Sequence, residues 1–563
     1  MSQPQETPLS AFYRWEKQTP QQIFLRQPLS GNWKTWTFQQ AGEEARRIAT
    51  ALQAFNLPAQ SNIAILSKNC AHWIITDLAI MMAGYVSVPI YPTLSPSGIK
   101  EILHHSDTKV IFLGKLDDYE KQQRGIDPKL HKITFPFYGL HDELKWEDLL
   151  RIHQPLKESV LPDPERIASI MYSSGTTGTP KGVMLSFGAF GFVGVRVKKY
   201  LRLHKPQRFF SYLPLSHIAE RALMEMVALS SGSTISFTES VQKFQEDLQH
   251  EKPTIFGGVP RIFAKFQEAI LQKIPQQKLD RLLAVPLINI FLQRMILKKL
   301  GLTKASIIVC GAAPTPVSLL NWFNKLGIEI RETYGMTENT AYSHSNFRLI
   351  RNGTVGQPWP EVDVKCDDAG EILIRHPALM KGYYKDPVTT AAVFTEDGFL
   401  RTGDQGTTDQ QGFLTITGRV KDQFKTEKAK FIAPAPIELK LSSDVNIDQV
   451  CVVGTGLPQP IALVTLSSAG REKSNEVLEL EVNRTIESTN LTLEKHERLQ
   501  AAVILRDNWS IENGLLTPSL KIKRNAVEKL YEGRYIEWFN EQRIIIWESE
   551  KKKQKTENQK QKV

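Results

Sequence analysis

The residues best suited to chemistry form a loop of small hydroxyl residues and glycines that ends in a lysine. It runs Tyr172-Ser-Ser-Gly-Thr-Thr-Gly-Thr-Pro-Lys-Gly182, directly after an apolar stretch that predicts a strand. Such a loop brings backbone N–H groups close to phosphate oxygens, and its lysine adds a positive charge. It is not a Walker A loop, because Gly182 follows the lysine and the glycine spacing differs. We predict a phosphate-binding loop, with a flexible surface loop as the alternative, formed by Ser173, Ser174, Gly175, Thr176, Thr177, Gly178, Thr179 and Lys181.

Two further motifs are weaker when each is taken alone. Tyr334-Gly335-Met-Thr337-Glu338 offers a planar ring for a base, a hydroxyl for a phosphate and a carboxylate for Mg²⁺. Asp404 could accept both hydroxyls of a ribose, and Arg419 could hold the same sugar or a phosphate. The alternative for each motif is an ordinary turn with a surface charge.

A fourth motif, Gly514-Leu-Leu-Thr-Pro-Ser-Leu-Lys-Ile-Lys-Arg524, places Lys521 on a loop ahead of a helix. A lysine there could neutralise charge in a transition state. The alternative is a solvated basic start of a helix, which is the commoner fate of such a run.

The elements around these motifs alternate between helical and strand patterns. We predict strands at 62–66, 86–90, 109–113, 167–172, 209–213, 234–237, 255–256 and 307–310, and helices at 39–55 and 73–83. This alternation of strands and helices indicates an α/β domain of several layers with parallel-rich sheets. From residue 362, short strands at 371–375, 398–401 and 412–417 with Gly and Asp turns predict a small antiparallel barrel or hairpins.

The composition of the chain excludes several classes of protein. The chain has 563 residues, of which 41% are hydrophobic, and a net charge of +10. There is no basic stripe interleaved with aromatic residues, which argues against nucleic acid as a partner. The four cysteines form no CxxC pair, so we expect neither a zinc site nor a disulfide scaffold, and a cytoplasmic location. The polar N-terminus has no signal core, and the lysine-rich tail from 550 to 563 is typical of disordered, solvated chain.

In this order and at these distances, the four motifs resemble those of the adenylate-forming enzymes, from about Trp36 to Tyr531. Three segments look like the long-chain fatty acid–CoA ligase branch: 213–221 (Leu-Pro-Leu-Ser-His-Ile-Ala-Glu-Arg), 258–261 (Gly-Val-Pro-Arg) and 517–524 (Thr-Pro-Ser-Leu-Lys-Ile-Lys-Arg). The resemblance implies a large N-terminal domain over residues 1–418, a smaller mobile α+β domain over 419–549, and the tail.

The resemblance also implies a role for individual residues. The loop from Ser173 to Lys181 would hold the β- and γ-phosphates of ATP, and Glu338 with Thr176 would hold Mg²⁺. The other nucleotide contacts would come from Gly311, Ala312, Ala313 and Pro314 along the adenine, Tyr334 stacked on it, Gly335 next to Tyr334, Thr337 at the α-phosphate, and Asp404 with Arg419 at the ribose. The catalytic candidates are Lys521 for adenylation, His217 beside the acyl carboxylate, and Lys425, with Lys421 as the hinge.

The implied reaction joins a fatty acid to coenzyme A through an acyl-adenylate, with release of pyrophosphate and AMP. Lys521 would act in the first step and then swing away as the small domain rotates about the hinge. One departure concerns the second step, since Ala429 stands where relatives usually carry a glycine that permits a positive φ. Two alternatives therefore stay open: transfer to an acyl carrier protein, and a non-catalytic protein that binds acyl groups or nucleotides.

One segment, Val285 to Leu302, is amphipathic if it is helical. Its apolar residues Leu287, Ile288, Phe291, Met295 and Leu300 are interspersed with Arg294, Lys298 and Lys299. We hypothesise that it lies against a membrane near the acyl entrance, as a peripheral contact. The alternative, which the sequence supports equally well, is a helix that packs against its own domain.

Overall fold

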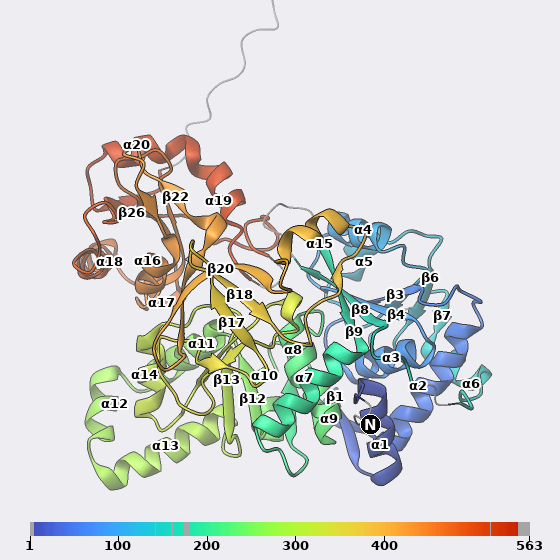
Figure 1. The fold of residues 1–563 in the computed structure, drawn as a ribbon. Coiled ribbons are helices and arrows are strands. Elements are labelled where there is room, and N and C mark those ends of the chain that lie inside the picture. Colours follow the sequence, from blue (N-terminus) through green and yellow to red (C-terminus); the bar gives the residue numbers. More distant parts are fainter. Residues whose placement is uncertain (1–4, 141, 159–160, 174–179, 518–519, 550–563) are drawn as a thin grey trace, which may run out of the picture. The chain divides into compact units, whose positions relative to one another are not determined.

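The computed structural model describes residues 5–140, 142–158, 161–173, 180–517 and 520–549. The chain divides into two compact units, Met1–Ile416 and Thr417–Val563. The proposed domain limits, 1–418 and 419–549, remain a prediction. Figure 1 shows the elements of both units.

The first unit contains a nine-stranded sheet that is parallel over six consecutive strands, from β14 to β1. Antiparallel strands close both of its edges. In spatial order the strands are β16 (Gln357–Pro358), β15 (His344–Ser345), β14 (Arg331–Tyr334), β13 (Ile307–Cys310), β12 (Ile255–Gly258), β10 (Arg208–Ser211), β11 (Thr234–Phe237), β1 (Ile23–Leu29) and β2 (Asn32–Thr37).

A second sheet of the same unit has eight strands and is parallel from β8 to β7. Its order is β19 (Gly382–Tyr383), β9 (Lys181–Ser186), β8 (Ile167–Ser173), β4 (Val86–Ile90), β3 (Asn62–Leu66), β5 (Val110–Leu113), β6 (His131–Thr134) and β7 (Leu144–Lys145). The β8–β9 hairpin is antiparallel and carries the predicted phosphate loop at its turn.

Helices between the two sheets form the largest core. The helix α3 (Ala71–Met82) contacts β1 of one sheet and β3 and β4 of the other, and all of its residues are buried. A helix that is apolar on every side is expected at such a position. The same core receives α1 (Pro8–Gln18), α2 (Phe38–Gln53), α7 (Phe187–Tyr200) and α9 (Val227–Ser231).

A second core lies beside β12 and β13. It is built by α10 (Phe244–Glu251), α11 (Pro260–Leu271), α12 (Gln276–Leu283), α13 (Pro286–Leu300) and α14 (Val317–Lys325). Figure 1 shows α12, α13 and α14 together at the outer edge of this unit. The remaining helices of the unit are α4 (Pro96–His105), α5 (Tyr119–Gln122), α6 (Trp146–Ile152), α8 (Ile218–Glu220) and α15 (Pro387–Val393).

The region predicted as a barrel or hairpins is a four-stranded sheet. Its strands are β17 (Asp363–Cys366), β18 (Glu371–Arg375), β20 (Leu400–Thr408) and β21 (Leu414–Arg419), and the first two pairs are antiparallel. β17 and β21 are the two edge strands and do not pair with each other. The described strands therefore form an open sheet rather than a closed barrel.

The second unit is an α+β fold, as predicted. Its sheet runs β24 (Ile447–Val453), β25 (Ile461–Leu466), β26 (Ala501–Ile504) and β27 (Ile545–Trp547), with a separate hairpin of β22 (Phe424–Lys425) and β23 (Phe431–Ile432). Two apolar cores contain alternate residues of these strands, such as Val450 and Val452 in one and Cys451 and Val453 in the other. The helices are α16 (Pro434–Leu441), α17 (Ser468–Arg471), α18 (Asn475–Asn490), α19 (Arg524–Tyr531) and α20 (Tyr535–Asn540).

Candidate active site

Four neighbouring parallel strands of the nine-stranded sheet end in the residues that the sequence singled out. Tyr334 ends β14, Gly311 follows β13, the segment 258–261 follows β12, and His217 follows β10. Ligands of parallel sheets bind where the carboxyl ends of the strands meet. The topology therefore gathers motifs that lie more than a hundred residues apart along the chain.

Tyr334 and Asp404 are directly joined. The Tyr334 hydroxyl donates a hydrogen bond to Asp404 Oδ2 at 2.7 Å, and both residues are buried. The tyrosine comes from β14, and the aspartate from β20 of the four-stranded sheet. This bond fixes the orientation of a carboxylate suited to accept ribose hydroxyls next to a ring suited to face a base.

Glu338 and Lys181 are connected through a residue that the sequence reasoning missed, Tyr383. The Tyr383 hydroxyl donates to Glu338 Oε1 at 2.9 Å, and Lys181 Nζ lies 4.9 Å from the centre of the Tyr383 ring. Tyr383 lies on β19, which pairs with β9 directly after the predicted phosphate loop. The ring of Tyr383 thus contacts a cation through its face and a carboxylate through its hydroxyl.

The loop itself lies mostly outside the described residues, which end at Ser173 and resume at Pro180. Ser174, Gly175, Thr176, Thr177, Gly178 and Thr179 therefore remain predictions. Ser173 is the last residue of β8 and pairs with Lys181, the first residue of β9. Both ends of the loop are thus fixed by the hairpin.

Two glycines near Tyr334 are required by close packing. A Cβ at Gly335 would lie 2.6 Å from the backbone of Ala341, and one at Gly311 would lie 3.0 Å from the carbonyl oxygen of Thr333. Side chains cannot be accommodated at these distances without movement of the backbone. After Gly311, Ala312 has a φ of 68°, a left-handed conformation that is uncommon for alanine and often marks functional loops.

His217 has a defined hydrogen-bonding pattern. Its Nδ1 accepts a hydrogen bond at 3.2 Å from the backbone N–H of Ala219, at the start of α8. Because Nδ1 is the acceptor, a neutral His217 carries its proton on Nε2, which is then a donor. Such a donor suits a substrate carboxylate, and the predicted place of His217 beside the acyl carboxylate remains a prediction.

Arg221, at the end of the same motif, has a structural role. It forms an ion pair with Asp77 at 2.6 Å, and both side chains are completely buried. Its guanidinium also lies 5.3 Å from the ring centres of Trp73 and Phe190. Burial raises the pKa of Asp77, and Arg221 acts in the opposite direction. The arginine therefore anchors the segment behind His217 to α3.

Lys521 belongs to the second unit, where a tight loop presents it. Thr517 N–H donates to the Lys521 carbonyl at 2.8 Å, and Lys521 N–H donates to the Thr517 hydroxyl at 3.0 Å. Leu520, directly before the lysine, has a φ of 63°. Residues 518 and 519 lie outside the described part of the chain.

The base of this loop is fixed by Arg524. Its guanidinium donates to the Val452 carbonyl at 2.7 Å and to the carboxylate of Glu438, and its Nε lies 3.8 Å from Asp422. Burial alone would lower the pKa of Arg524, but the two carboxylates raise it. One largely buried arginine thus connects the loop of Lys521 to the chain just after Lys421.

The other predicted residues of the second unit follow in sequence. Arg419 ends β21, Lys421 lies in a short 3₁₀ turn at Val420–Asp422, and Lys425 ends β22 with its Nζ 4.7 Å from the centre of the Phe431 ring. In the turn between β22 and β23, Ala429 has a φ of 56°. The backbone thus adopts the conformation that a glycine would favour, in spite of the alanine.

The described residues can be tested for a fit to Mg²⁺. Within 5–140, 142–158, 161–173, 180–517 and 520–549, no group of three or more His, Cys, Asp and Glu could hold a metal by itself. Mg²⁺ commonly takes one or two protein carboxylates and completes its shell with water and substrate phosphates. The single carboxylate of Glu338 fits that kind of site.

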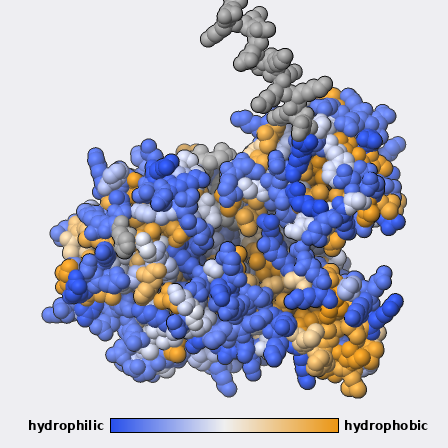
Figure 2. All heavy atoms as spheres, turned by 180° about the vertical axis from the view of Figure 1, so that it is seen from behind, coloured by the Kyte–Doolittle hydropathy of each residue, from blue (hydrophilic) through white to orange (hydrophobic). Residues whose placement is uncertain are grey.

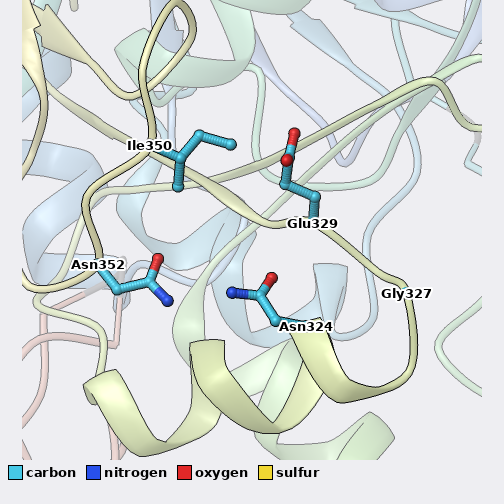
Figure 3. Close-up of a pocket in the computed structure, with 5 residues that line it drawn as sticks. All are labelled: Asn324, Gly327, Glu329, Ile350 and Asn352. Atoms are coloured by element: carbon cyan, nitrogen blue, oxygen red, sulfur yellow. The ribbon is translucent and has the colours of Figure 1, made fainter.

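A separate pocket lies away from these residues. Figure 3 shows its lining by Asn324, Gly327, Glu329, Ile350 and Asn352. Gly327 and Glu329 precede β14, whereas Tyr334 ends it. The pocket is therefore at the amino end of that strand, opposite to the end at which parallel sheets bind their ligands.

The fold, with polar side chains gathered at the carboxyl ends of parallel strands, is that of a ligand-binding α/β enzyme domain. Comparison with known protein families identifies the class of enzyme more closely. Residues 12–384 match the AMP-binding enzyme family, and residues 421–542 match the AMP-binding enzyme C-terminal domain. The chain belongs to the AMP-binding enzyme family.

Curated relatives cover nearly the whole chain. The chain is 28% identical to long-chain-fatty-acid–CoA ligase FadD15 of Mycobacterium bovis, over 92% of this chain and 94% of that one. It is 27% identical to human long-chain-fatty-acid–CoA ligase 6, over 90% of this chain and 82% of that one.

Solved structures share the fold. The adenylation domain of a carboxylate reductase from Mycobacterium chelonae aligns with a TM-score of 0.79 at 21% identity, over 96% of this chain and 92% of that one. An anthranilate CoA ligase in complex with anthranoyl-AMP aligns with a TM-score of 0.76 at 20% identity, over 93% and 97%.

Proposed function

We propose that this protein is an ATP-dependent ligase that converts a long-chain fatty acid into its coenzyme A thioester through an acyl-adenylate. The observation that carries the proposal is the pair Tyr334–Asp404 beside the group Lys181–Tyr383–Glu338, at strand ends of an AMP-binding enzyme fold. The names of the relatives support the long-chain acyl substrate and the coenzyme A acceptor.

In the proposed first half-reaction, a carboxylate oxygen of the fatty acid attacks the α-phosphorus of ATP and the bond to pyrophosphate breaks. Both reactants are anionic, so the protein has to offset their repulsion. Lys521 supplies a positive charge at the α-phosphate, and Lys181 and the 173–181 loop hold the outgoing phosphates. Glu338, together with Thr176, would hold Mg²⁺, which would supply further neutralisation of phosphate charge.

The remaining residues hold the nucleotide and the acid in place. Asp404 and Arg419 bind the ribose, the 311–314 segment and Tyr334 with Gly335 flank the adenine, and Thr337 contacts the α-phosphate. The Nε2–H of His217 donates to the acyl carboxylate. The support for these roles is the convergence of the described residues of the first unit on one edge of its sheets.

In the proposed second half-reaction, the thiol of coenzyme A attacks the acyl carbonyl and AMP leaves. Rotation about Lys421 would withdraw Lys521 and bring in the segment of Lys425. The support is the division of the chain into two units near this residue, and the positive φ at Ala429, which gives the turn a glycine-like backbone. The latter favours coenzyme A over an acyl carrier protein as the acceptor.

The test follows the two half-reactions separately in purified protein. Pyrophosphate release with fatty acids of increasing length measures the first, and thioester formation from supplied acyl-adenylate measures the second. Lys521→Ala is expected to abolish the first and spare the second. Equal loss of both would contradict the role of Lys521, and no pyrophosphate release by the unmodified protein with any acid would refute the function. Radiolabelled acyl transfer to coenzyme A and to acyl carrier protein separates the two acceptors.

The proposed location is the cytoplasm, with contact to a membrane from its surface. Within the described part of the chain, no helix has both the length and the apolar character to span a bilayer. The four cysteines, Cys70, Cys310, Cys366 and Cys451, are all free thiols, which suits a reducing compartment.

A further inference from the structure

An exposed apolar surface covers the corner between α12 and α13. Leu287 and Phe291 are 83% and 72% exposed, and Val285, Ile288 and Ile290 are exposed beside them. We call these five residues the apolar tip. Figure 2 shows a concentration of hydrophobic residues at this corner, at the lower right of the view. A contiguous apolar patch on a protein surface usually marks a site of interaction.

The tip is carried by a helix that is firmly packed on its other side. Leu292, Ile296 and Leu300 of α13 are buried in the core beside β12 and β13. The helix begins with Pro286 at its first position and ends at Gly301, which has a φ of 76°. The outward-facing apolar residues of α13 therefore do not contribute to the core beneath the helix. Packing within the domain does not explain why they are apolar.

The chain on both sides of the tip is strongly basic. Between residues 273 and 304, all basic side chains are exposed, and Asp280 is the one acidic residue. The basic residues are Lys273, Lys278, Arg281, Arg294, Lys298, Lys299 and Lys304. Such a surface attracts polyanions and repels a second copy of itself, because association of two identical faces would bring like charges together.

The apolar and basic residues are segregated along the axis of α13. Leu287 and Lys298 are eleven residues apart, which at 100° per residue places them on almost the same side of the helix. They are separated by about 16 Å along the axis. The outward face is thus apolar over its first two turns and basic over its last two.

We infer that this corner is a membrane-docking surface, at which the apolar tip enters the boundary between headgroups and acyl chains of an anionic bilayer. The basic second half of α13 then contacts lipid phosphates. Exposed apolar side chains next to basic ones bind anionic lipid surfaces by burial of apolar area together with electrostatic attraction. The inference does not depend on the proposed function, but it deepens it, because a long-chain fatty acid dissolves in the same layer.

Vesicle flotation of the full-length protein tests the inference. We expect binding to vesicles that contain phosphatidylglycerol, much weaker binding to pure phosphatidylcholine, and release by added salt. Leu287→Glu with Phe291→Glu should weaken binding to anionic vesicles by at least about 10-fold, since each side chain loses its burial in the bilayer. Lys298→Gln with Lys299→Gln should weaken it by about 10-fold and flatten the dependence on salt.

The matched control is Ile152→Glu with Leu491→Glu. These residues are 67% and 84% exposed and add the same two negative charges. Figure 1 shows α6, which ends at Ile152, on the opposite side of the first unit from α12 and α13. Every variant keeps the lysine-rich tail, so its contribution is constant. The control should bind like the unmodified protein, and all variants should keep the melting temperature and pyrophosphate release in detergent solution.

Three results would overturn the inference. The tip variant could float as well as the unmodified protein, or the unmodified protein could bind neutral and anionic vesicles equally at all salt concentrations. A dimer of the unmodified protein that the tip variant dissociates in analytical ultracentrifugation would assign the surface to a second copy instead. If pyrophosphate release is absent while flotation behaves as expected, the proposed function fails and the docking surface stands.

Discussion

The hydroxyl of Tyr334 donates a hydrogen bond to the carboxylate of Asp404 across 70 positions of the chain. Their strands belong to different sheets, so the bond links the nine-stranded sheet to the four-stranded one within the first unit. A buried carboxylate that accepts from a neutral hydroxyl keeps a fixed direction. The bond therefore positions the residue that the proposed function assigns to the ribose.

Tyr334→Phe is expected to weaken ATP binding and to keep the ring that faces the base. The loss of a hydrogen bond to a charged group costs about 1.5–3 kcal/mol, which corresponds to a rise in the KM for ATP of about 10-fold or more. The KM for the fatty acid should change little. Steady-state pyrophosphate release, measured against each substrate in turn, gives both constants.

The control for that change is Tyr342→Phe. The Tyr342 hydroxyl is also engaged, with the Pro360 carbonyl at 2.9 Å, but it has no proposed role at the nucleotide. This variant should leave both KM values unchanged. An equal rise of the KM for ATP in the two variants would indicate a general loss of stability and would contradict the role of Tyr334.

Much of the fold was predictable because continuous apolar runs mark buried parallel strands. The predicted ranges 62–66, 86–90, 234–237 and 307–310 are those of β3, β4, β11 and β13. In contrast, β20 extends from Leu400 to Thr408 although only 398–401 was predicted. Its buried positions alternate with exposed ones and include Thr402, Asp404 and Gly406, so the pattern contains few apolar residues that would reveal it.

The site was predictable only in part, for a different reason. Tyr383 received no role because its partners, Lys181 and Glu338, are close to it only in the folded chain. Arg221 was noticed only as part of the 213–221 motif. Its partner Asp77 lies on α3, a helix whose hydrophobicity predicts a buried position but no ion pair. The local sequence pattern identifies candidate site residues. The arrangement of the sheets in the folded chain determines which of these residues come into contact.

Arg524→Met should impair adenylation more than thioester formation. The arginine holds the base of the Lys521 loop against Glu438 and the Val452 carbonyl, so its loss should displace the lysine. We expect pyrophosphate release to fall by about 10-fold or more, since small displacements of catalytic groups have large effects on rate. Thioester formation from supplied acyl-adenylate should fall much less, and Arg524→Lys should recover part of the first activity.

Arg534→Met provides a matched control in the same unit. Arg534 forms an ion pair with Glu548 at 3.0 Å, and its side chain is 14% exposed, compared with 13% for Arg524. Both variants lose a largely buried ion pair and should lower the melting temperature similarly. If Arg534→Met reduced adenylation as much as Arg524→Met does, a specific positioning role for Arg524 would be ruled out.

Ala429→Gly should stabilise the second unit. With a φ of 56°, the alanine pays a steric cost that glycine does not, and relief of it is worth about 1 kcal/mol. Denaturant unfolding measures the gain. The same change at Ala433, where φ is −94°, should instead destabilise the protein slightly, because glycine there only adds freedom to the unfolded chain. A loss of stability in both variants would show that the turn is not strained.

Glu220→Gln should reduce the dependence of stability on pH between about pH 5 and about pH 8. Burial raises the pKa of the Glu220 carboxyl from 4.5 to about 8, with hydrogen bonds from Ser211 and the Tyr212 backbone acting in the opposite direction. Between these values the folded protein keeps a proton that the unfolded chain has released. The stabilisation is therefore complete below pH 4.5 and is lost as the pH rises through about 8, at up to about 1.4 kcal/mol per pH unit. Glutamine cannot titrate, so the melting temperature of the variant should fall less over this range. The charge of Glu220, which raises the pKa of the neighbouring Glu225, is also absent from the variant. Parallel pH profiles of the two melting temperatures would contradict a protonated Glu220 in the folded state.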